Sequence, residues 1–129
     1  MITDKHKILA RLVELSQWEW ANLPLLNTVV GRHVYFCIVH DAIFHSANPS
    51  DRSLKQVLNH PEYTDRAVRM KLRELEDEGL ITRVCNEKDK RARQIQPTPK
   101  LLELMKQHAE NLQKVLEKDF IILEKNLDK

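Results

Sequence analysis

Residues 53–100, SLKQVLNHPEYTDRAVRMKLRELEDEGLITRVCNEKDKRARQIQPTPK, decide the fold of this chain. They predict a helix at residues 53–59, a tight corner at 60–63, and a second helix from Thr64 to Glu78 that Gly79 ends. Two strand-like runs follow, Leu80 to Cys85 and Arg93 to Gln96, with a charged hairpin at residues 86–92 between them. Two helices joined by a short corner and followed by a hairpin form a winged helix-turn-helix, whose second helix commonly enters DNA.

The second helix of this unit has one apolar face and a good start. Thr64 is a suitable N-cap, and Tyr63 before it is placed to pack on Val68 one turn into the helix. At 100° per residue Val68 shares one face with Leu72 and Leu75. This face predicts the core side of the helix, which Leu80 and Ile81 continue into the strand.

The charges of the same helix are separated along its length. Residues 66–73 contain four basic residues and no acid, and residues 74–78 contain four acids and no base. A helix that only has to be soluble would mix its charges for pairing between neighbouring turns. The basic half is the N-terminal half, which in a recognition helix meets the groove, so the pattern favours a nucleic-acid surface.

Residues 64–100 resemble the DNA-binding core of the MarR-type winged-helix regulators. The match includes Leu75, residues 78–81, Arg83, the wing residues Asp89-Lys90-Arg91-Ala92-Arg93, and the strand that ends at Thr98. The resemblance implies that Arg91 is the wing-tip residue that reaches the minor groove, with Asp89 steadying it.

We expect the DNA contacts to come from both helices and the wing. Arg66, Arg69 and Arg73 would face the major groove, Lys71 would reach a phosphate at its edge, and Ser53 and Lys55 would contact the backbone. The full expected set is Ser53, Lys55, Thr64, Arg66, Arg69, Met70, Lys71, Arg73, Lys90, Arg91 and Arg93.

The N-terminal part of the chain, residues 1–47, predicts two helices. The first spans residues 4 to about 18, capped by Thr3 or Asp4, with less regular chain from Trp18 to Pro24. Trp18 and Trp20 are interpreted as core or interface residues, with a small-molecule pocket as the alternative. The first helix has an apolar face formed by Ile8, Leu9, Leu12, Val13 and Leu15.

The second helix is predicted from Thr28 to about Ser46. Its main face consists of Gly31, Val34, Tyr35, Ile38, Val39 and Ala42. Its other side carries His33, Phe36, Cys37, His40 and Phe44. A helix that is apolar most of the way round is central in its fold or also packs on a partner.

The C-terminal part, residues 98–129, predicts one long helix that starts at Thr98-Pro99. Nearly thirty residues extend about 40 Å, which is longer than a small domain needs for its own core. Two apolar strips run along it: one is Leu102, Met105, Ala109, Leu112, Leu116, Phe120, Leu123 and Leu127, and the other is Leu101, Leu104, Val115 and Ile122. We expect this helix and the first to form a symmetric homodimer; the alternative is a helix that folds back over its own monomer.

Composition limits the class of protein. The 129 residues have a net charge of only +2, but residues 50–97 hold all of the basic surplus. Neither a signal peptide nor a membrane span is indicated, and the distant Cys37 and Cys85 form no disulfide framework, so we expect a cytoplasmic protein. The sequence lacks a phosphate-binding glycine loop, a GxSxG elbow and an HExxH motif, so we do not expect an enzyme.

One cluster raises a metal-binding hypothesis. His33, Cys37 and His40 fall within about 60° of one helical face, and a divalent metal could add Asp41 or His108. A half-buried helix face with a free thiol and two hydrogen-bonded histidines is the commoner outcome of such spacing. We therefore expect no metal and no other cofactor.

Together these features predict a mainly α fold with a small β-hairpin wing: a winged helix-turn-helix at residues 50–97 between N-terminal helices at 1–47 and a dimerisation helix at 98–129. The expected function is a double-stranded DNA-binding transcriptional regulator that acts as a homodimer. One alternative is a winged-helix protein–protein adaptor, with the acids of residues 74–78 and the long C-terminal helix as its working surfaces. The other is a metal-sensing regulator of the same fold. The sequence does not identify an operator or a small-molecule effector.

Overall fold

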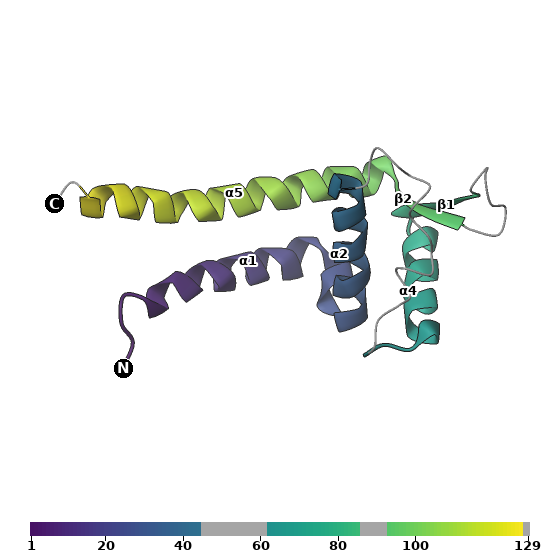
Figure 1. Cartoon of the computed structure of the whole chain (residues 1–129), viewed down its shortest axis with the longest axis horizontal. Helices are drawn as coiled ribbons and strands as arrows, with labels where there is room; N and C mark the ends of the chain where they lie inside the picture. Colours follow the sequence, from purple (N-terminus) through teal and green to yellow (C-terminus); the bar gives the residue numbers. More distant parts are fainter. Residues whose placement is uncertain (45–61, 86–92, 128–129) are drawn as a thin grey trace. The chain divides into compact units, whose positions relative to one another are not determined.

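The computed structural model describes residues 1–44, 62–85 and 93–127, and in these ranges the chain is mainly helical with one two-stranded antiparallel hairpin (Figure 1). The described chain divides into two compact units. One consists of residues 1–24 and 104–129, and the other of residues 25–103, so that helix α2 is grouped with the hairpin rather than with the N-terminal helix. The described elements are η1 (His6–Ile8), α1 (Leu9–Asn22), η2 (Pro24–Asn27), α2 (Val29–Phe44), α4 (Asp65–Asp77), β1 (Ile81–Cys85), β2 (Arg93–Pro97) and α5 (Pro99–Leu127).

In the unit of residues 25–103, helix α4 has the boundaries and the core face that its sequence predicts. Thr64 is the N-cap, and its hydroxyl oxygen accepts a hydrogen bond from the backbone N–H of Ala67 at 3.1 Å. Val68, Leu72 and Leu75 are buried. The helix ends in the left-handed conformation of Gly79, with φ at +75°, which lets the N–H of Leu80 bond back to the carbonyl of Leu75.

The hairpin after α4 continues this core. Strands β1 and β2 pair antiparallel, with Ile81 opposite Pro97 and Cys85 opposite Arg93. Ile81 and Ile95 are buried, so one face of the two-stranded sheet packs inward. The expected first helix at residues 53–59 and the hairpin tip at residues 86–92 lie outside the described residues.

Helix α2 supplies the other side of this core through the main face that its sequence predicts. Gly31, Val34, Tyr35 and Ile38 are buried on its main face, and Phe36 and Phe44 are exposed on the other. Gly31 has a steric role: a Cβ there would lie 1.9 Å from the carbonyl oxygen of Leu25. Its N–H also bonds the hydroxyl of Thr28, which precedes the helix. Only glycine fits where the chain turns from η2 into α2.

The start of α5 is tied to the end of α4. The hydroxyl of Thr98 accepts from the N–H of Leu101 at 3.3 Å and donates to the carbonyl oxygen of Gly79 at 2.7 Å. The ammonium of Lys100 donates to the carbonyl of Glu78 at 3.0 Å. The helix start predicted at Thr98-Pro99 is therefore confirmed, and it also closes the C-terminal end of α4.

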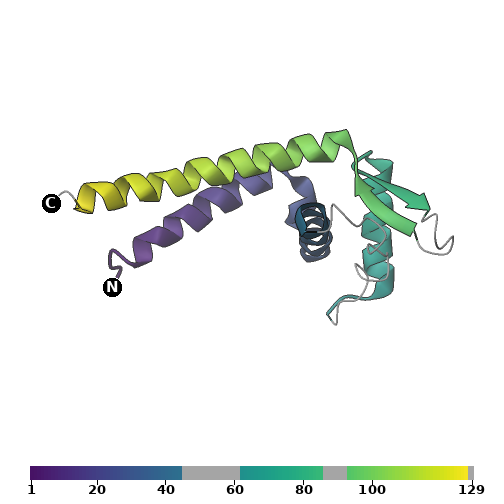
Figure 2. The ribbon, with the colours of Figure 1, turned by 45° about the horizontal axis from the view of Figure 1, so that its top comes forward.

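In the unit of residues 1–24 and 104–129, α1 and α5 lie side by side and run antiparallel (Figures 1 and 2). The imidazole of His108 lies 3.0 Å from a carboxylate oxygen of Glu19 and stacks on Trp18, with ring centroids 5.6 Å apart. Closer to the N-terminus of α1, the ammonium of Lys118 donates to the carboxylate of Glu14 at 2.9 Å. These polar contacts hold the two helices together between their apolar positions.

Two expectations about the N-terminal helix were wrong. Neither Thr3 nor Asp4 caps it with a side chain: the chain enters through the 3-10 turn η1, which has no side-chain cap bond. The helix also does not end near Trp18 but continues to Asn22, because the Asn22 amide donates to the carbonyl of Trp18 and Pro24 lies beyond that end.

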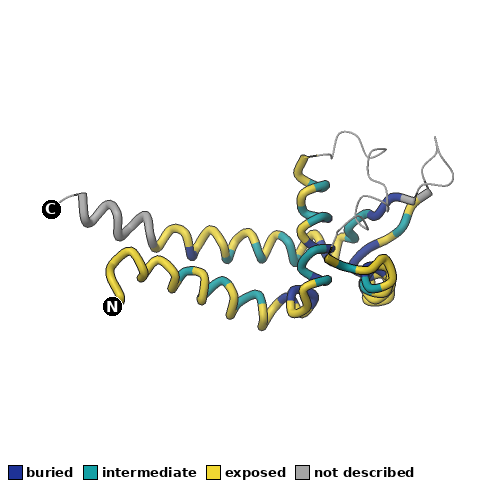
Figure 3. Tube along the Cα trace, turned by 60° about the horizontal axis from the view of Figure 1, so that its bottom comes forward, coloured by how far each residue is buried: buried dark blue, intermediate teal, exposed yellow. Residues whose placement is uncertain are grey.

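The apolar positions of α1 and α5 are only partly covered. In one of the two strips on α5, Leu101 and Val115 are buried and Leu104 is half-buried, whereas Leu102, Leu112 and Leu116 of the other are exposed. Figure 3 shows that much of the described part of α5 is exposed. Ile8, Leu9, Leu12 and Val13 of η1 and α1 are exposed as well. Phe120, Ile122, Leu123 and Leu127 lie in a part of α5 whose side chains are outside the described residues. Among the helices that the structure describes, none has a stretch apolar and long enough to cross a membrane.

Candidate nucleic-acid interface

The outer face of α4 carries three arginines. Arg66, Arg69 and Arg73 are spaced at i, i+3 and i+7, which places them within about 60° of one another around the helix. All three side chains are exposed, on the side opposite the buried Val68 and Leu72. The helix therefore presents a row of guanidinium groups, and its burial against α2 and the hairpin fixes the direction in which they point.

These arginines take no part in the ion pairs of the described residues. Within residues 62–85 and the other described ranges, no ion pair engages Arg66, Arg69 or Arg73. A guanidinium held by a carboxylate would have to give up that pair before it bound another anion. Side chains without such a pair are available to a ligand without this cost.

The neighbouring charges are paired within the chain. The ammonium of Lys71 lies 2.8 Å from Glu74, and its side chain is only 17% exposed. Arg83 Nε on β1 lies 3.0 Å from Glu76, an ion pair without hydrogen-bond geometry. Glu74 and Glu76 thus neutralise local cations. Arg83 was not assigned this role from the sequence, because the contact depends on how β1 packs beside α4.

The size of the arginine row suits a groove. From Arg66 to Arg73 the helix rises roughly 10 Å, and the major groove of B-DNA is about 12 Å wide. Thr64 lies at the N-terminal end of this face, where its oxygen is already used as the cap but its O–H proton can still be donated. Met70 is exposed among the arginines.

Several expected contact residues cannot be placed. Ser53, Lys55, Lys90 and Arg91 lie outside the described residues. The backbone of Arg93 lies in β2 opposite Cys85, and its side chain is outside the described part. The structure therefore brings together the α4 group of the expected set, and the contacts of Ser53, Lys55 and the wing group stay predictions.

The histidines considered as metal ligands have other neighbours. His33 lies 3.8 Å from the sulfur of Cys37 and packs against the ring of Tyr63, whereas His40 packs against Phe44. Burial, and to a lesser degree the Asp41 carboxylate, raise the pKa of the Cys37 thiol, which disfavours the thiolate that a metal needs. Across the part of the chain that the structure describes, no three His, Cys, Asp or Glu side chains gather as a metal site.

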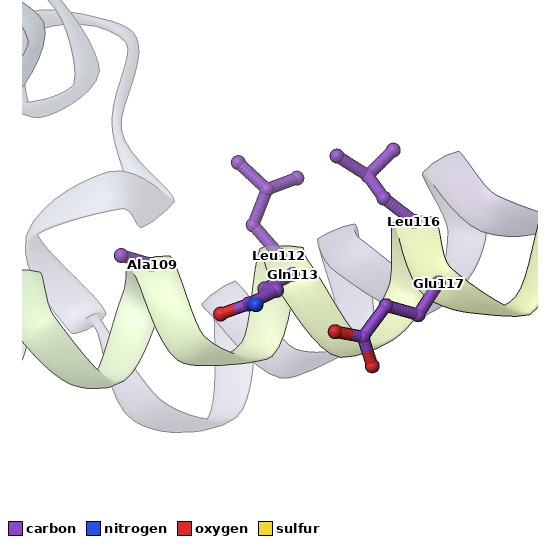
Figure 4. A pocket seen from close by; sticks show the side chains of 5 residues that line it. All are labelled: Ala109, Leu112, Gln113, Leu116 and Glu117. Carbon is purple, nitrogen blue, oxygen red and sulfur yellow. The ribbon is translucent and has the colours of Figure 1, made fainter. Parts of the chain in front are cut away.

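Two hollows lie on the unit of residues 1–24 and 104–129. One, of about 220 Å³, is lined by Trp18, Asn22, Gln107, Glu110, Asn111 and Lys114. The other, of about 430 Å³, lies along α5 beside Ala109, Leu112, Gln113, Leu116 and Glu117. Figure 4 shows Leu112 and Leu116 projecting from the same side of the helix. This apolar row follows from the three- and four-residue spacing of the sequence; the stacking of Trp18 on His108 does not, because it joins residues 90 positions apart.

Comparison with known proteins identifies the fold. Residues 43–95, fewer than half of the chain, match the model of the ribonuclease R winged-helix domain. No curated protein matches the sequence at a significant level.

Similar solved structures include a MepR variant from S. aureus bound to an oligodeoxyribonucleotide, which is 20% identical, with 99% of this chain and 95% of that one covered and a TM-score of 0.61. MepR of S. aureus bound to ethidium bromide is 19% identical, with 98% and 93% covered and a TM-score of 0.58. At this identity the likeness establishes the winged helix-turn-helix fold, as the sequence predicts.

Proposed function

We propose that the chain is a transcriptional regulator that binds double-stranded DNA as a homodimer, with α4 in the major groove and the hairpin between β1 and β2 at the minor groove. The observation that carries this proposal is the row of Arg66, Arg69 and Arg73 on the outer face of α4, which are exposed and form no ion pair with any residue that the structure describes. A guanidinium can bind guanine O6 and N7 with two hydrogen bonds, and it binds phosphate equally well.

The position of the row in the fold supports the same conclusion. In winged helix-turn-helix proteins the helix before the hairpin is the one that enters the groove. Here that helix is α4, and its basic half begins directly after the N-cap Thr64. A similar fold is seen bound to an oligodeoxyribonucleotide in MepR. The expected backbone contacts of Ser53 and Lys55 and the wing contacts of Lys90, Arg91 and Arg93 belong to this proposal.

The homodimer is supported by the exposed apolar row on α5. Leu112 and Leu116 are 40% and 46% exposed, and Leu12 and Val13 of α1 are exposed in the same unit. Exposed apolar side chains in a regular row are typical of a surface that another chain covers. A symmetric dimer would present two copies of α4 to half-sites about one helical turn apart.

The adaptor alternative loses support from the ion pairs. Its working surfaces would be the acids of residues 74–78 and the long helix α5. Of these acids, Glu74 pairs with Lys71 and Glu76 pairs with Arg83, so the first surface is partly neutralised within the chain. An adaptor would also have no use for three unpaired arginines on the same helix. A non-enzymatic, DNA-binding role accounts for the exposed arginines in residues 66–73 and for the ion-paired acids in residues 74–78.

The experiment that tests the proposal is a selection of bound duplexes from a random-sequence pool, followed by binding isotherms at several salt concentrations. We expect an enriched sequence with two related half-sites and an affinity that falls steeply with salt. Recovery of unenriched sequence with no salt-dependent binding would contradict the proposal and favour the adaptor.

A further inference from the structure

We propose that Met70 is a specificity-determining residue that contacts the 5-methyl group of a thymine in the major groove. This inference rests on the proposed function and deepens it, because it names one base that the α4 surface selects. The arginines of the surface account for guanine and phosphate contacts, and Met70 adds a contact of a different chemistry.

Met70 is the exception among the large apolar side chains of α4. Val68, Leu72 and Leu75 are buried, whereas Met70 is 56% exposed and points away from the core. It follows Arg69 directly, four residues after Arg66 and three before Arg73. It therefore lies on the outer face among the unpaired arginines.

A thioether in this position can complement only a limited part of a DNA surface. It carries no donor, and its sulfur is a weak acceptor, so it cannot replace a guanidinium at a phosphate or at guanine. Of the groups that base pairs expose in the major groove, the thymine methyl is the apolar one. Methionine is flexible and polarizable, and adapts its shape to such a group.

The spacing of the face predicts where this thymine lies. Arg66 and Arg73 are separated by roughly 10 Å along the helix, which corresponds to about three base-pair steps at 3.4 Å each. Met70 lies between them along the axis. The thymine is therefore expected within the half-site, between the positions contacted by the first and the last arginine, and not at its edge.

The test uses the full-length protein and the duplex obtained by selection from random sequence. Each thymine of one half-site is replaced in turn by deoxyuridine, which removes the methyl group and leaves all hydrogen-bonding groups in place. At one internal thymine we expect the affinity of the unaltered protein to fall about fourfold, the effect of one methyl group. Thymines outside the half-sites are the control, and their replacement by deoxyuridine should leave the affinity unchanged.

The protein side of the test uses two variants. Met70→Ala should bind the thymine and uracil duplexes equally, whereas Met70→Leu should keep most of the discrimination because it keeps an apolar side chain. Both variants should melt at the temperature of the unaltered protein, since the side chain is exposed.

The outcomes separate this inference from the proposed function. Specific binding with no uracil-sensitive thymine, or with no thymine inside the half-site, would overturn the role of Met70 and leave the DNA-binding function standing. If Met70→Ala still binds the thymine duplex more tightly than the uracil duplex, the role of Met70 is also overturned. Absence of any specific DNA binding would remove the proposed function and this inference together.

Discussion

The hydroxyl of Thr98 donates a 2.7 Å hydrogen bond to the carbonyl oxygen of Gly79. Thr98 directly precedes α5, and Gly79 follows the C-terminal end of α4, so one side chain joins the start of the long helix to the end of the helix that carries the arginine row. The same hydroxyl lies 3.1 Å from the carbonyl of Leu80 and accepts from Leu101 N–H. The orientation of α4 within its unit therefore depends on this threonine.

Replacing Thr98 by valine tests that dependence. The variant keeps the shape of the side chain but loses the cap of α5 and the bonds to residues 79 and 80, and we expect it to lower the free energy of unfolding by about 1–2 kcal/mol. Urea denaturation followed by circular dichroism measures the change. Thr82→Val, at an exposed position of β1, is the matched control and should change stability little.

The two glycines should respond differently to alanine. Gly79 has φ at +75° with open space around it, so Gly79→Ala should cost only about 1 kcal/mol of backbone strain, and Gly79→Asn less. In Gly31→Ala the added Cβ would meet the Leu25 carbonyl oxygen at 1.9 Å, and we expect a loss of about 3 kcal/mol or more. Equal stabilities of the two alanine variants in urea would contradict the packing at Gly31.

Much of the unit of residues 25–103 could be predicted from the sequence, because its signals are local. The cap at Thr64, the buried row of Val68, Leu72 and Leu75, and the helix start at Thr98-Pro99 each follow from neighbouring residues, and the structure confirms them. The start and end of α1 were predicted wrongly, since the segment from Trp18 to Asn22 has no clear apolar period and is held by a side-chain bond within the helix.

The charges of the candidate site were only partly predictable. The pair of Lys71 with Glu74 follows from their i, i+3 spacing, although Lys71 was expected to reach a phosphate. The pair of Arg83 with Glu76 joins a strand to a helix and has no local signal. Which apolar positions of α5 are covered also depends on tertiary packing, which periodicity alone does not give.

The contact of α1 with α5 through Glu14 should depend on pH. The hydrogen bond from Lys118, with help from Arg11, holds the pKa of the Glu14 carboxyl below its ordinary value of 4.5 against the opposing effect of desolvation. A lowered pKa in the folded state means that the stabilisation is complete above the ordinary value and is lost as pH falls through the lowered one.

We therefore expect Glu14→Gln to be less stable than the unaltered protein at neutral pH and equal to it in strong acid. Thermal melts across this pH range measure the difference, which should be small and should shrink in 1 M salt because the pair is partly exposed. Lys118→Met should weaken the same pH dependence but not abolish it, because Arg11 still pairs with Glu14 at 2.6 Å. A difference that grows on acidification would contradict the assigned pair.

Dimerisation is tested on the exposed row of α5. Leu112→Asp and Leu116→Asp each place a charge on the surface that is proposed to meet the second copy, and we expect monomers in sedimentation at micromolar concentration. Gln107→Asp introduces the same charge at another exposed position of α5 and should leave the dimer intact. An unaltered protein that sediments as a monomer at high concentration would defeat the dimer proposal.

The wing is proposed to act through phosphate and groove width rather than through base edges. Arg91→Ala should therefore weaken binding to the selected operator and to a scrambled duplex by similar factors, and should reduce the slope of log affinity against log salt by about one. A loss confined to the selected operator would instead make Arg91 a reader of sequence.

The central claim, that the unpaired arginines of α4 read DNA in the major groove, is tested most directly at Arg69. Binding isotherms of Arg69→Ala against the selected operator and single-base variants of it should show a loss of about 1–3 kcal/mol and a relaxed preference at one base position. Lys106→Ala removes a charge from an exposed position of α5 and should bind like the unaltered protein. If Arg69→Ala and Lys106→Ala both retain full affinity and the same base preferences, α4 is not the DNA-reading helix and the account is contradicted.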